Sequence, residues 1–131
     1  MEKIKLSVCG LVIYSERFLI VKRSETDDFL PNSWEFPGGS VETSETIPEA
    51  LMRELQEEIG LDMSTARAEL IGISEEYMDN GARYLQLNYR IALSKKPVIK
   101  LSSEHVAYDW TDAQDARLDS FLKDIIKQNQ K

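Results

Sequence analysis

The chain has 131 residues, 42% of them hydrophobic and 30% charged, and a formal net charge of −7. These values are typical of a single globular domain, residues 1–131, and they argue against broad electrostatic binding to nucleic acid or to an anionic membrane. Because the sequence contains no long apolar run, no recognisable signal peptide and only one cysteine, Cys9, we expect a cytoplasmic protein without a transmembrane helix or an internal disulfide.

The N-terminal part is predicted to form strands that lead into a glycine turn. Strands are expected at residues 3–14 and 18–22. A polar loop at residues 24–32 and a short third strand at residues 33–36 should follow them. Ser15 and Glu16 would form the turn that joins the first two strands as a hairpin. Pro37, Gly38 and Gly39 are expected to force another turn.

A helix is predicted to follow this turn, with clear signals at both ends. Thr46 and Glu49 fit a capping box at its start, and Gly60 fits the C-terminal cap. The apolar residues that recur at helical spacing are Leu51, Leu55 and Ile59. The helix is therefore expected to pack this stripe against the core.

Three glutamates, Glu54, Glu57 and Glu58, occupy the C-terminal half of this helix. The helix macrodipole disfavours negative charge there, and Glu54 stands at spacings from the other two at which like charges repel. All three fall within one arc beside the buried stripe, at the edge of an expected cleft. Carboxylate ligands suit Mg²⁺ or Mn²⁺, which points to metal-assisted attack on a phosphorus centre; a solvated acidic face is the alternative.

The C-terminal half is predicted to be mostly β, with one final helix. Strands are expected at residues 69–77, 84–93, 98–101 and 106–110. A turn at residues 79–81 would make the first two a hairpin, and Thr111 with Gln114 fit a capping box for the helix. The apolar residues that this helix would bury are Leu118, Phe121, Leu122, Ile125 and Ile126. This order of elements predicts an α+β fold with a mixed sheet between helices.

The residues around the acidic helix resemble the Nudix box. Every specified position of that motif is matched at the required spacing, by Gly39, Glu45, Arg53, Glu54, Leu55, Glu57, Glu58, Gly60 and Leu61. The resemblance implies a Nudix fold, a monomer or homodimer, and hydrolysis of a nucleoside diphosphate linked to another group, with Mg²⁺ (or Mn²⁺) as cofactor. Ser44 replaces the glycine that many relatives carry before the first glutamate, a departure that concerns the loop rather than the metal site.

The resemblance also implies roles for single residues. The Gly39 carbonyl and the three helix glutamates would bind the metal, while Arg53 and Glu45 would orient the helix and its loop. The candidate catalytic residues are Arg53, Glu54, Glu57 and Glu104. The general base would be Glu54 or Glu104, and Glu104 could equally be a solvated loop acid.

The segment before the motif, residues 32–39, resembles the MutT-type branch of the family. Members of that branch hydrolyse oxidised or ordinary nucleoside triphosphates to monophosphates and pyrophosphate. By this resemblance Phe36 would approach the base, Arg23 would approach the phosphates, and Gly38 would lie in the substrate site. Phe36 could instead be a core aromatic, and Arg23 an exposed residue at a strand end.

Other functions stay open at this level. Tyr77 lies near the position of a tyrosine typical of dinucleoside polyphosphate hydrolases, although it could be a core or hairpin residue. ADP-ribose hydrolases tend to have a proline shortly after the motif, and none occurs between Pro48 and Pro97. A non-catalytic nucleotide-binding module is a further alternative. His105 could contact a phosphate or be a packed or surface loop residue.

Overall fold

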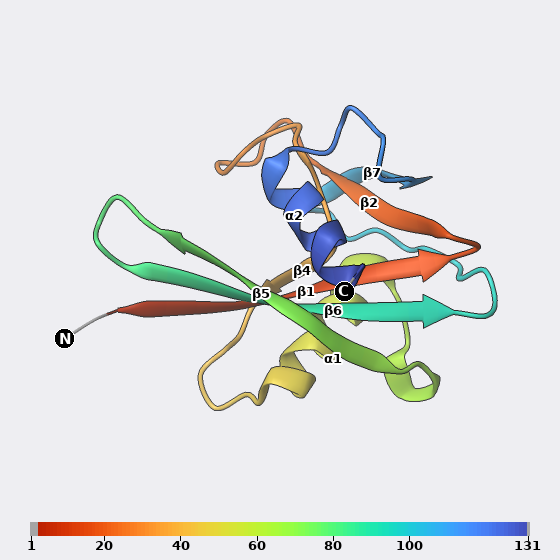
Figure 1. Cartoon of the computed structure of the whole chain (residues 1–131), viewed down its shortest axis with the longest axis horizontal. Coiled ribbons are helices and arrows are strands. Elements are labelled where there is room, and N and C mark those ends of the chain that lie inside the picture. The colour runs from red at the N-terminus through yellow and green to blue at the C-terminus, as the bar shows by residue number, and fades with distance from the viewer. Residues whose placement is uncertain (1–2, 131) are drawn as a thin grey trace.

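The computed structural model describes residues 3–130, which form a seven-stranded mixed sheet with a helix on each face (Figure 1). The strands are β1 Ile4–Tyr14, β2 Arg17–Arg23, β3 Trp34–Glu35, β4 Gly38–Ser40, β5 Ala68–Tyr77, β6 Arg83–Leu93 and β7 His105–Thr111. The helices are α1 Ile47–Ile59, the short 3₁₀ helix η1 Met63–Thr65, and α2 Ser120–Asn129. The predicted α+β class and the sheet between helices are confirmed.

β1 is the central strand of the sheet, whose order is β3-β2-β1-β6-β5, with β4 paired to β1 and β7 paired to β2. β6 runs parallel to β1 in continuous register from the Ile4–Arg83 pair to the Tyr14–Leu93 pair. A parallel neighbour needs a long crossover, and the chain between β1 and β6 contains α1. The other pairings are antiparallel. In Figure 1 the β5–β6 hairpin and the start of β1 project to one side, beyond both helices.

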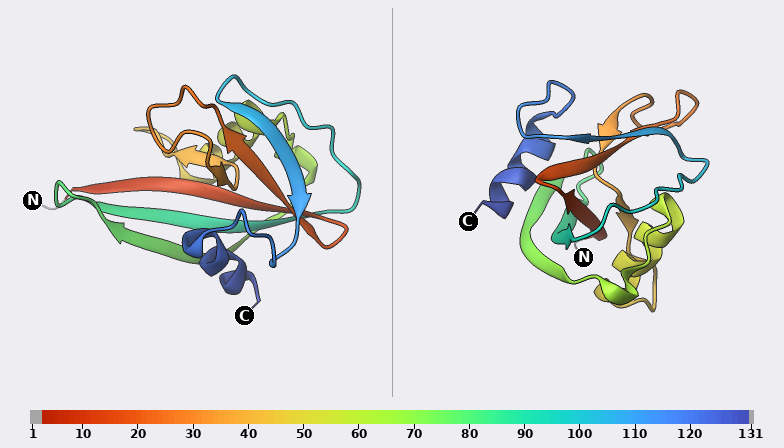
Figure 2. Two further views of the ribbon diagram at one scale, coloured as in Figure 1. Left: turned by 90° about the horizontal axis from the view of Figure 1, so that it is seen from above. Right: turned by 90° about the vertical axis from the view of Figure 1, so that its right-hand side faces the viewer.

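Alternate residues of β1 divide the core into two clusters on opposite faces of the sheet. Val8 and Val12 pack in the cluster that contains the buried stripe of α1, whereas Cys9 and Leu11 pack in the cluster that contains α2. Figure 2 shows the two helices on opposite sides of the strands. Of the predicted apolar stripes, Leu51, Leu55 and Ile59 of α1 and Leu122, Ile125 and Ile126 of α2 are buried. Phe121 is only partly buried, and Leu118 is buried but precedes α2. The predicted stripe of α1 is therefore confirmed, and that of α2 is confirmed in part.

The predicted turn lies at Phe36 and Pro37, between β3 and β4, and the glycines that follow it belong to strand β4 rather than to the turn. β4 pairs with β1 in antiparallel register, with Gly39 opposite Val8. A Cβ atom built at Gly38 would lie 2.1 Å from the carbonyl oxygen of Val8. Among the described glycines, a positive φ occurs at Gly60 and Gly81 and not in this segment. Glycine is needed at residue 38 because the two backbones come close together, not because a positive φ is required.

Residues 98–101 form no strand, although their pattern predicts one. Backbone N–H groups in and after this segment bind the end of α1 instead. Lys100 donates to the Ile59 carbonyl at 2.9 Å, and Ser102 donates to the Glu58 carbonyl at 3.1 Å. The last carbonyls of a helix have no partners within the helix. The segment therefore completes the hydrogen bonding of α1 rather than extending the sheet.

The capping pattern predicts that the last helix begins at Thr111, but α2 begins after Asp119. Thr111 is the last residue of β7, and its hydroxyl donates to the carboxylate of Asp115. The Asp119 carboxylate accepts the backbone N–H of Leu122 at 2.9 Å. Asp119 is thus the capping residue, and the residues between β7 and α2 form turns.

Candidate active site

Both ends of α1 lie where the sequence predicts them. The Thr46 hydroxyl accepts the Glu49 N–H at 3.3 Å, and the Glu49 carboxylate accepts the Thr46 N–H at 3.0 Å, so the capping box is complete. Gly60 adopts the left-handed conformation with φ of 69° and ends the helix. These local signals fix the length of α1 and hence the direction in which its glutamates project.

Arg53 is the centre of a charge network on α1. Its Nε and Nη2 donate to the two carboxylate oxygens of Glu45 at 2.7 and 3.0 Å. Its Nη1 donates to Glu54 at 2.8 Å and to Glu57 at 3.3 Å. Nη2 also donates to the Ser40 carbonyl at 3.0 Å, which ties the helix to β4. Because the guanidinium contacts both Glu54 and Glu57, it offsets the repulsion that their spacing predicts.

Glu45 should make the stability of the protein depend on acidic pH. The hydrogen bonds from Arg53 lower the pKa of its carboxyl from 4.5 to about 2. A carboxyl with a lower pKa in the folded state stabilises the fold above its unfolded-state pKa, and this contribution is lost as the pH falls through the folded-state value. We therefore expect Glu45→Gln to lower the free energy of unfolding at neutral pH.

Urea denaturation of the wild type and Glu45→Gln across the acidic range measures this effect. The difference in unfolding free energy should shrink as the pH falls from 4.5 to about 2, because both forms then carry an uncharged side chain at this position. A difference that stays constant over this range would contradict the assigned Glu45–Arg53 interaction.

Glu54 lies against the backbone of Gly39. A Cβ atom built at Gly39 would come within 2.4 Å of Glu54 Oε2, so glycine leaves the room that this carboxylate occupies. The Glu54 side chain is 13% exposed, and burial raises its pKa despite the hydrogen bond from Arg53. Two residues predicted as metal ligands, Gly39 and Glu54, are thus adjacent.

Glu57 and Glu58 face different surroundings, although the sequence predicts one acidic arc. The Glu57 side chain is 60% exposed and lies beside Arg53. The Glu58 side chain is 6% exposed, and its Oε1 accepts the N–H of Gly38 at 2.6 Å. Burial raises the pKa of Glu58 to about 8. The helix therefore presents one carboxylate to solvent and buries the other against β4.

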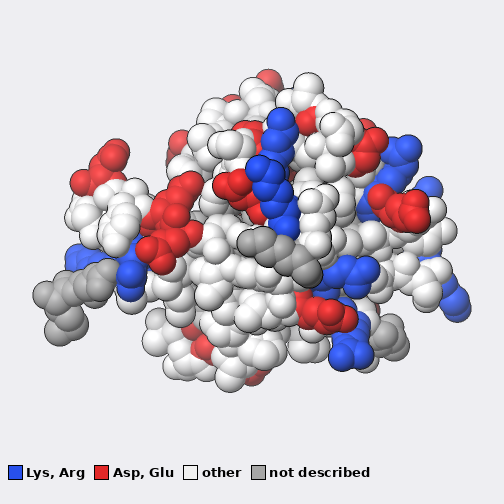
Figure 3. Space-filling model, viewed as in Figure 1, with Lys and Arg blue, Asp and Glu red and all other residues white. Residues whose placement is uncertain are grey.

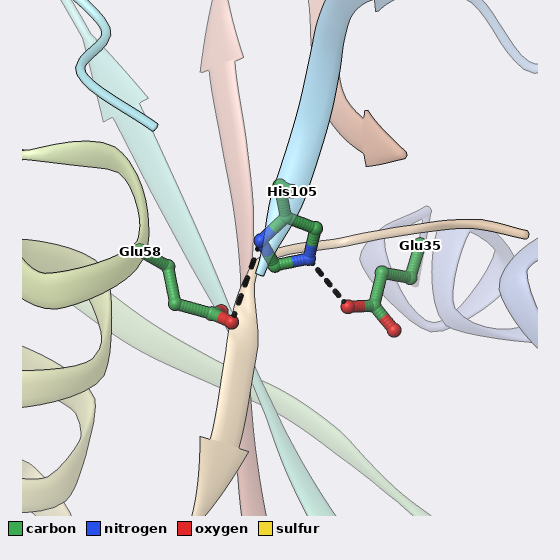
Figure 4. A group of neighbouring side chains, drawn as sticks. All are labelled: Glu35, Glu58 and His105. Carbon is green, nitrogen blue, oxygen red and sulfur yellow. Dashed lines mark hydrogen bonds and ion pairs between the residues drawn. The ribbon is translucent and has the colours of Figure 1, made fainter. Parts of the chain in front are cut away.

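Glu58 forms a cluster with His105 of β7, which is also buried, and with Glu35 of β3, which is partly exposed (Figure 4). His105 Nδ1 lies 3.8 Å from Glu58 Oε2, and Nε2 lies 2.8 Å from Glu35 Oε2. Burial alone would lower the pKa of His105, but the hydrogen bond with Glu35 and the charge of Glu58 raise it overall. No motif in the sequence singles out Glu35. Of the alternatives stated for His105, the packed position is the one observed.

Arg23 extends this cluster toward the loop after β2. Its Nε donates to Glu35 Oε1 at 2.9 Å, and its Nη1 donates to Asp27 at 2.9 Å. Its guanidinium also lies over the Phe29 ring, 5.5 Å from the centroid. Arg23 is therefore engaged in ion pairs next to His105, rather than being the exposed strand-end residue of the alternative interpretation.

The remaining predicted site residues lie in three different environments. Glu104 is an exposed residue in the loop before β7, and its charge contributes to the raised pKa of Glu54. Phe36 is 5% exposed and packs in the core cluster with α2, which is the structural alternative for this aromatic. Tyr77 is 72% exposed and pairs with Arg83 at the projecting end of the sheet. The structure does not bring Tyr77 to the glutamates of α1.

Comparison with known proteins gives a family match and several relatives. The NUDIX domain family model matches residues 3–128. An 8-oxo-dGTP diphosphatase of Proteus vulgaris is 38% identical over 65 residues, which are 49% of this chain and 58% of that protein, so less than two thirds of that relative is covered. Nucleoside triphosphatase NudI of Escherichia coli O139:H28 is 28% identical over 115 residues, 82% of each chain.

The fold is also similar to solved structures. The crystal structure of a MutT protein from Methanosarcina mazei Go1 superposes with a TM-score of 0.79. The superposition covers 99% of this chain and 98% of that one at 23% sequence identity. At this identity the likeness concerns the fold alone.

Proposed function

This chain belongs to the NUDIX domain family, and on that premise we propose that it is a Mg²⁺-dependent pyrophosphohydrolase that converts a nucleoside triphosphate to the monophosphate and pyrophosphate. The observation that carries the proposal is the arrangement of Glu54, Glu57 and Arg53 on α1 against the glycine strand β4. The substrate class is supported by the names of the two relatives, a diphosphatase of 8-oxo-dGTP and a nucleoside triphosphatase.

The residues present fit a divalent cation. Burial raises the pKa of both Glu54 and Glu58, so a cation bound beside them would stabilise their charged forms. The hydrogen bonds of Arg53 reach Glu54 and Glu57 but not Glu58. These three carboxylates and the Gly39 carbonyl would hold Mg²⁺ (or Mn²⁺), which prefers oxygen ligands. When bound, the ion would stabilise the negative charge that develops on phosphoryl oxygens.

The chain's own residues divide the remaining work. Arg53 orients Glu54 and Glu57 through direct hydrogen bonds, and Glu45 in turn holds Arg53 in place through a bidentate pair. Glu54 is the preferred candidate for the general base, because its side chain is 13% exposed and the hydrogen bond from Arg53 holds it in place. Glu104 is exposed and is the alternative base.

The surface charge is compatible with a small anionic substrate whose charge is offset by bound metal ions. The net charge is −7, and Figure 3 shows acidic and basic side chains interspersed on the face viewed, without a broad basic patch. We therefore expect a nucleotide rather than a nucleic acid as substrate. We also expect a monomer or homodimer that acts in the cytoplasm. Within residues 3–130, no helix is both long and apolar enough to cross a bilayer.

A substrate panel tests this function. The purified protein is incubated with ordinary and oxidised nucleoside triphosphates, ADP-ribose and dinucleoside polyphosphates, with Mg²⁺ or with a chelator. We expect turnover of a nucleoside triphosphate that stops in the chelator and returns with added Mg²⁺. Preference for ADP-ribose or a dinucleoside polyphosphate would contradict the proposed substrate class, and metal-independent turnover would contradict the role of the glutamates.

A further inference from the structure

The two ring nitrogens of His105 have unequal surroundings (Figure 4). The side chain is 1% exposed, and Nε2 lies 2.8 Å from Glu35 Oε2, a hydrogen-bond distance. Nδ1 is buried, makes no hydrogen bond, and points to Glu58 Oε2 at 3.8 Å. A buried polar atom without a hydrogen bond is uncommon in a folded protein and often marks an ion or water that belongs there.

Glu35 determines which nitrogen of His105 carries the proton. Arg23 donates to one oxygen of the Glu35 carboxylate, and the other oxygen faces Nε2. A carboxylate in this position accepts a hydrogen bond, so Nε2 is the donor and Nδ1 of a neutral ring presents its lone pair. A carboxylate that holds one nitrogen of a histidine is also the arrangement that orients histidines for metal binding in other proteins.

The lone pair of Nδ1 and the carboxylate of Glu58 therefore face each other across a gap. Glu58 Oε1 is occupied by the N–H of Gly38 at 2.6 Å, so Oε2 is the oxygen that faces His105. Two electron-rich atoms that face each other repel, and either a proton on Nδ1 or a metal cation between the two atoms removes this repulsion. The 3.8 Å separation is too long for a hydrogen bond, but two metal–ligand bonds of about 2.1 Å each can span it.

We propose that Glu58 Oε2 and His105 Nδ1 are ligands of one divalent transition-metal ion, and that Glu35 orients His105 for this role. The nitrogen ligand identifies the class of ion. Mg²⁺ takes oxygen ligands almost exclusively, whereas ions such as Mn²⁺ and Zn²⁺ accept imidazole together with carboxylate. This inference rests on the proposed function, because that proposal assigns Glu58 as a metal ligand, to which His105 adds a nitrogen ligand.

Pulsed electron paramagnetic resonance of the Mn²⁺-loaded protein tests this proposal. His105 is the single histidine of the sequence, so a tag-free chain can give a coupling from a histidine nitrogen only through this residue. We expect ¹⁴N modulation in the wild type and its loss in His105→Gln. Glu35→Gln should keep the ¹⁴N signal but raise the dissociation constant for Mn²⁺ by about 10- to 100-fold, since it perturbs only the residue that orients the ligand.

Circular dichroism and thermal melting show whether each variant is folded. If His105→Gln does not fold, the wild-type spectrum and the Glu35→Gln titration still decide the question. Absence of ¹⁴N modulation in the wild type, or unchanged Mn²⁺ affinity in a folded Glu35→Gln, would overturn the proposal. Nucleotide hydrolysis is measured separately: a ¹⁴N signal without hydrolysis would overturn the proposed function alone, and hydrolysis without a ¹⁴N signal would overturn this inference alone.

Discussion

Replacing Glu57 with glutamine is expected to lower kcat by at least about 100-fold while leaving the thermal stability nearly unchanged. The Glu57 side chain is 60% exposed and forms a 3.3 Å ion pair with Arg53. A surface ion pair of this kind contributes less than about 1 kcal/mol to stability. Glutamine keeps the shape of the side chain but removes the charge that a metal ion requires. Initial rates at saturating nucleoside triphosphate and Mg²⁺, with thermal melting of the same sample, measure both quantities.

Glu69→Gln is the matched control for this variant. Glu69 lies on β5 with 54% of its side chain exposed, and its 4.0 Å ion pair with Arg67 is equally superficial. The control removes the same charge by the same substitution at a place outside the candidate active site, so kcat should stay at the wild-type value. If Glu57→Gln retained a kcat within about twofold of the control, Glu57 would not be a metal ligand.

Replacing Gly38 with alanine is expected to reduce the free energy of unfolding by about 3 kcal/mol or more, which combines overpacking with the loss of strand pairing. The new Cβ would lie 2.1 Å from the Val8 carbonyl oxygen and 2.9 Å from the Cα of Cys9. Both are backbone atoms of the central strand β1, so neither can move away as a side chain would. The substitution should also displace the N–H of Gly38 from Glu58. Urea denaturation measures the stability.

Gly81→Ala separates this effect from the general cost of replacing a glycine. Gly81 has a φ of 83°, but a Cβ built there would meet nothing within 4 Å. Its cost should therefore be the conformational one, about 1–2 kcal/mol. If Gly38→Ala were no more destabilising than Gly81→Ala, the close approach of β4 to β1 would not explain the glycine at residue 38.

The features that the sequence predicts correctly depend on neighbours along the chain. The capping box of Thr46 and Glu49 and the left-handed cap at Gly60 involve residues within a few positions of each other. The strand predicted at residues 98–101 is absent for the opposite reason. Its hydrogen-bond partners are the carbonyls at the end of α1, far away in sequence, and its own alternation carries no information about them.

In the candidate active site, too, the contacts that the sequence predicts are the local ones. Helical periodicity places Glu54 and Glu57 close to Arg53, because all three lie on one helix. Glu35 and His105 are 70 residues apart and meet because β3 and β7 both pair with β2. A single sequence does not reveal that pairing.

Glu58 shows why consecutive residues of a helix need not share a role. Successive side chains project about 100° apart, so one residue can face solvent while the next one faces the sheet. Here Glu57 is exposed and Glu58 is buried against Gly38 and His105. The repeated spacing predicts a common acidic arc, but the packing of β4 against α1 decides which carboxylate is buried.

Product analysis by ³¹P NMR identifies which phosphoanhydride bond of the nucleotide the protein hydrolyses. The protein is mixed with the nucleoside triphosphate that the panel identifies, and spectra are recorded before and after Mg²⁺ is added. We expect pyrophosphate and the nucleoside monophosphate to appear together in equal amounts, and only after Mg²⁺ is added. Release of orthophosphate and a nucleoside diphosphate, or no hydrolysis of any nucleoside triphosphate in the presence of Mg²⁺, would contradict this expectation.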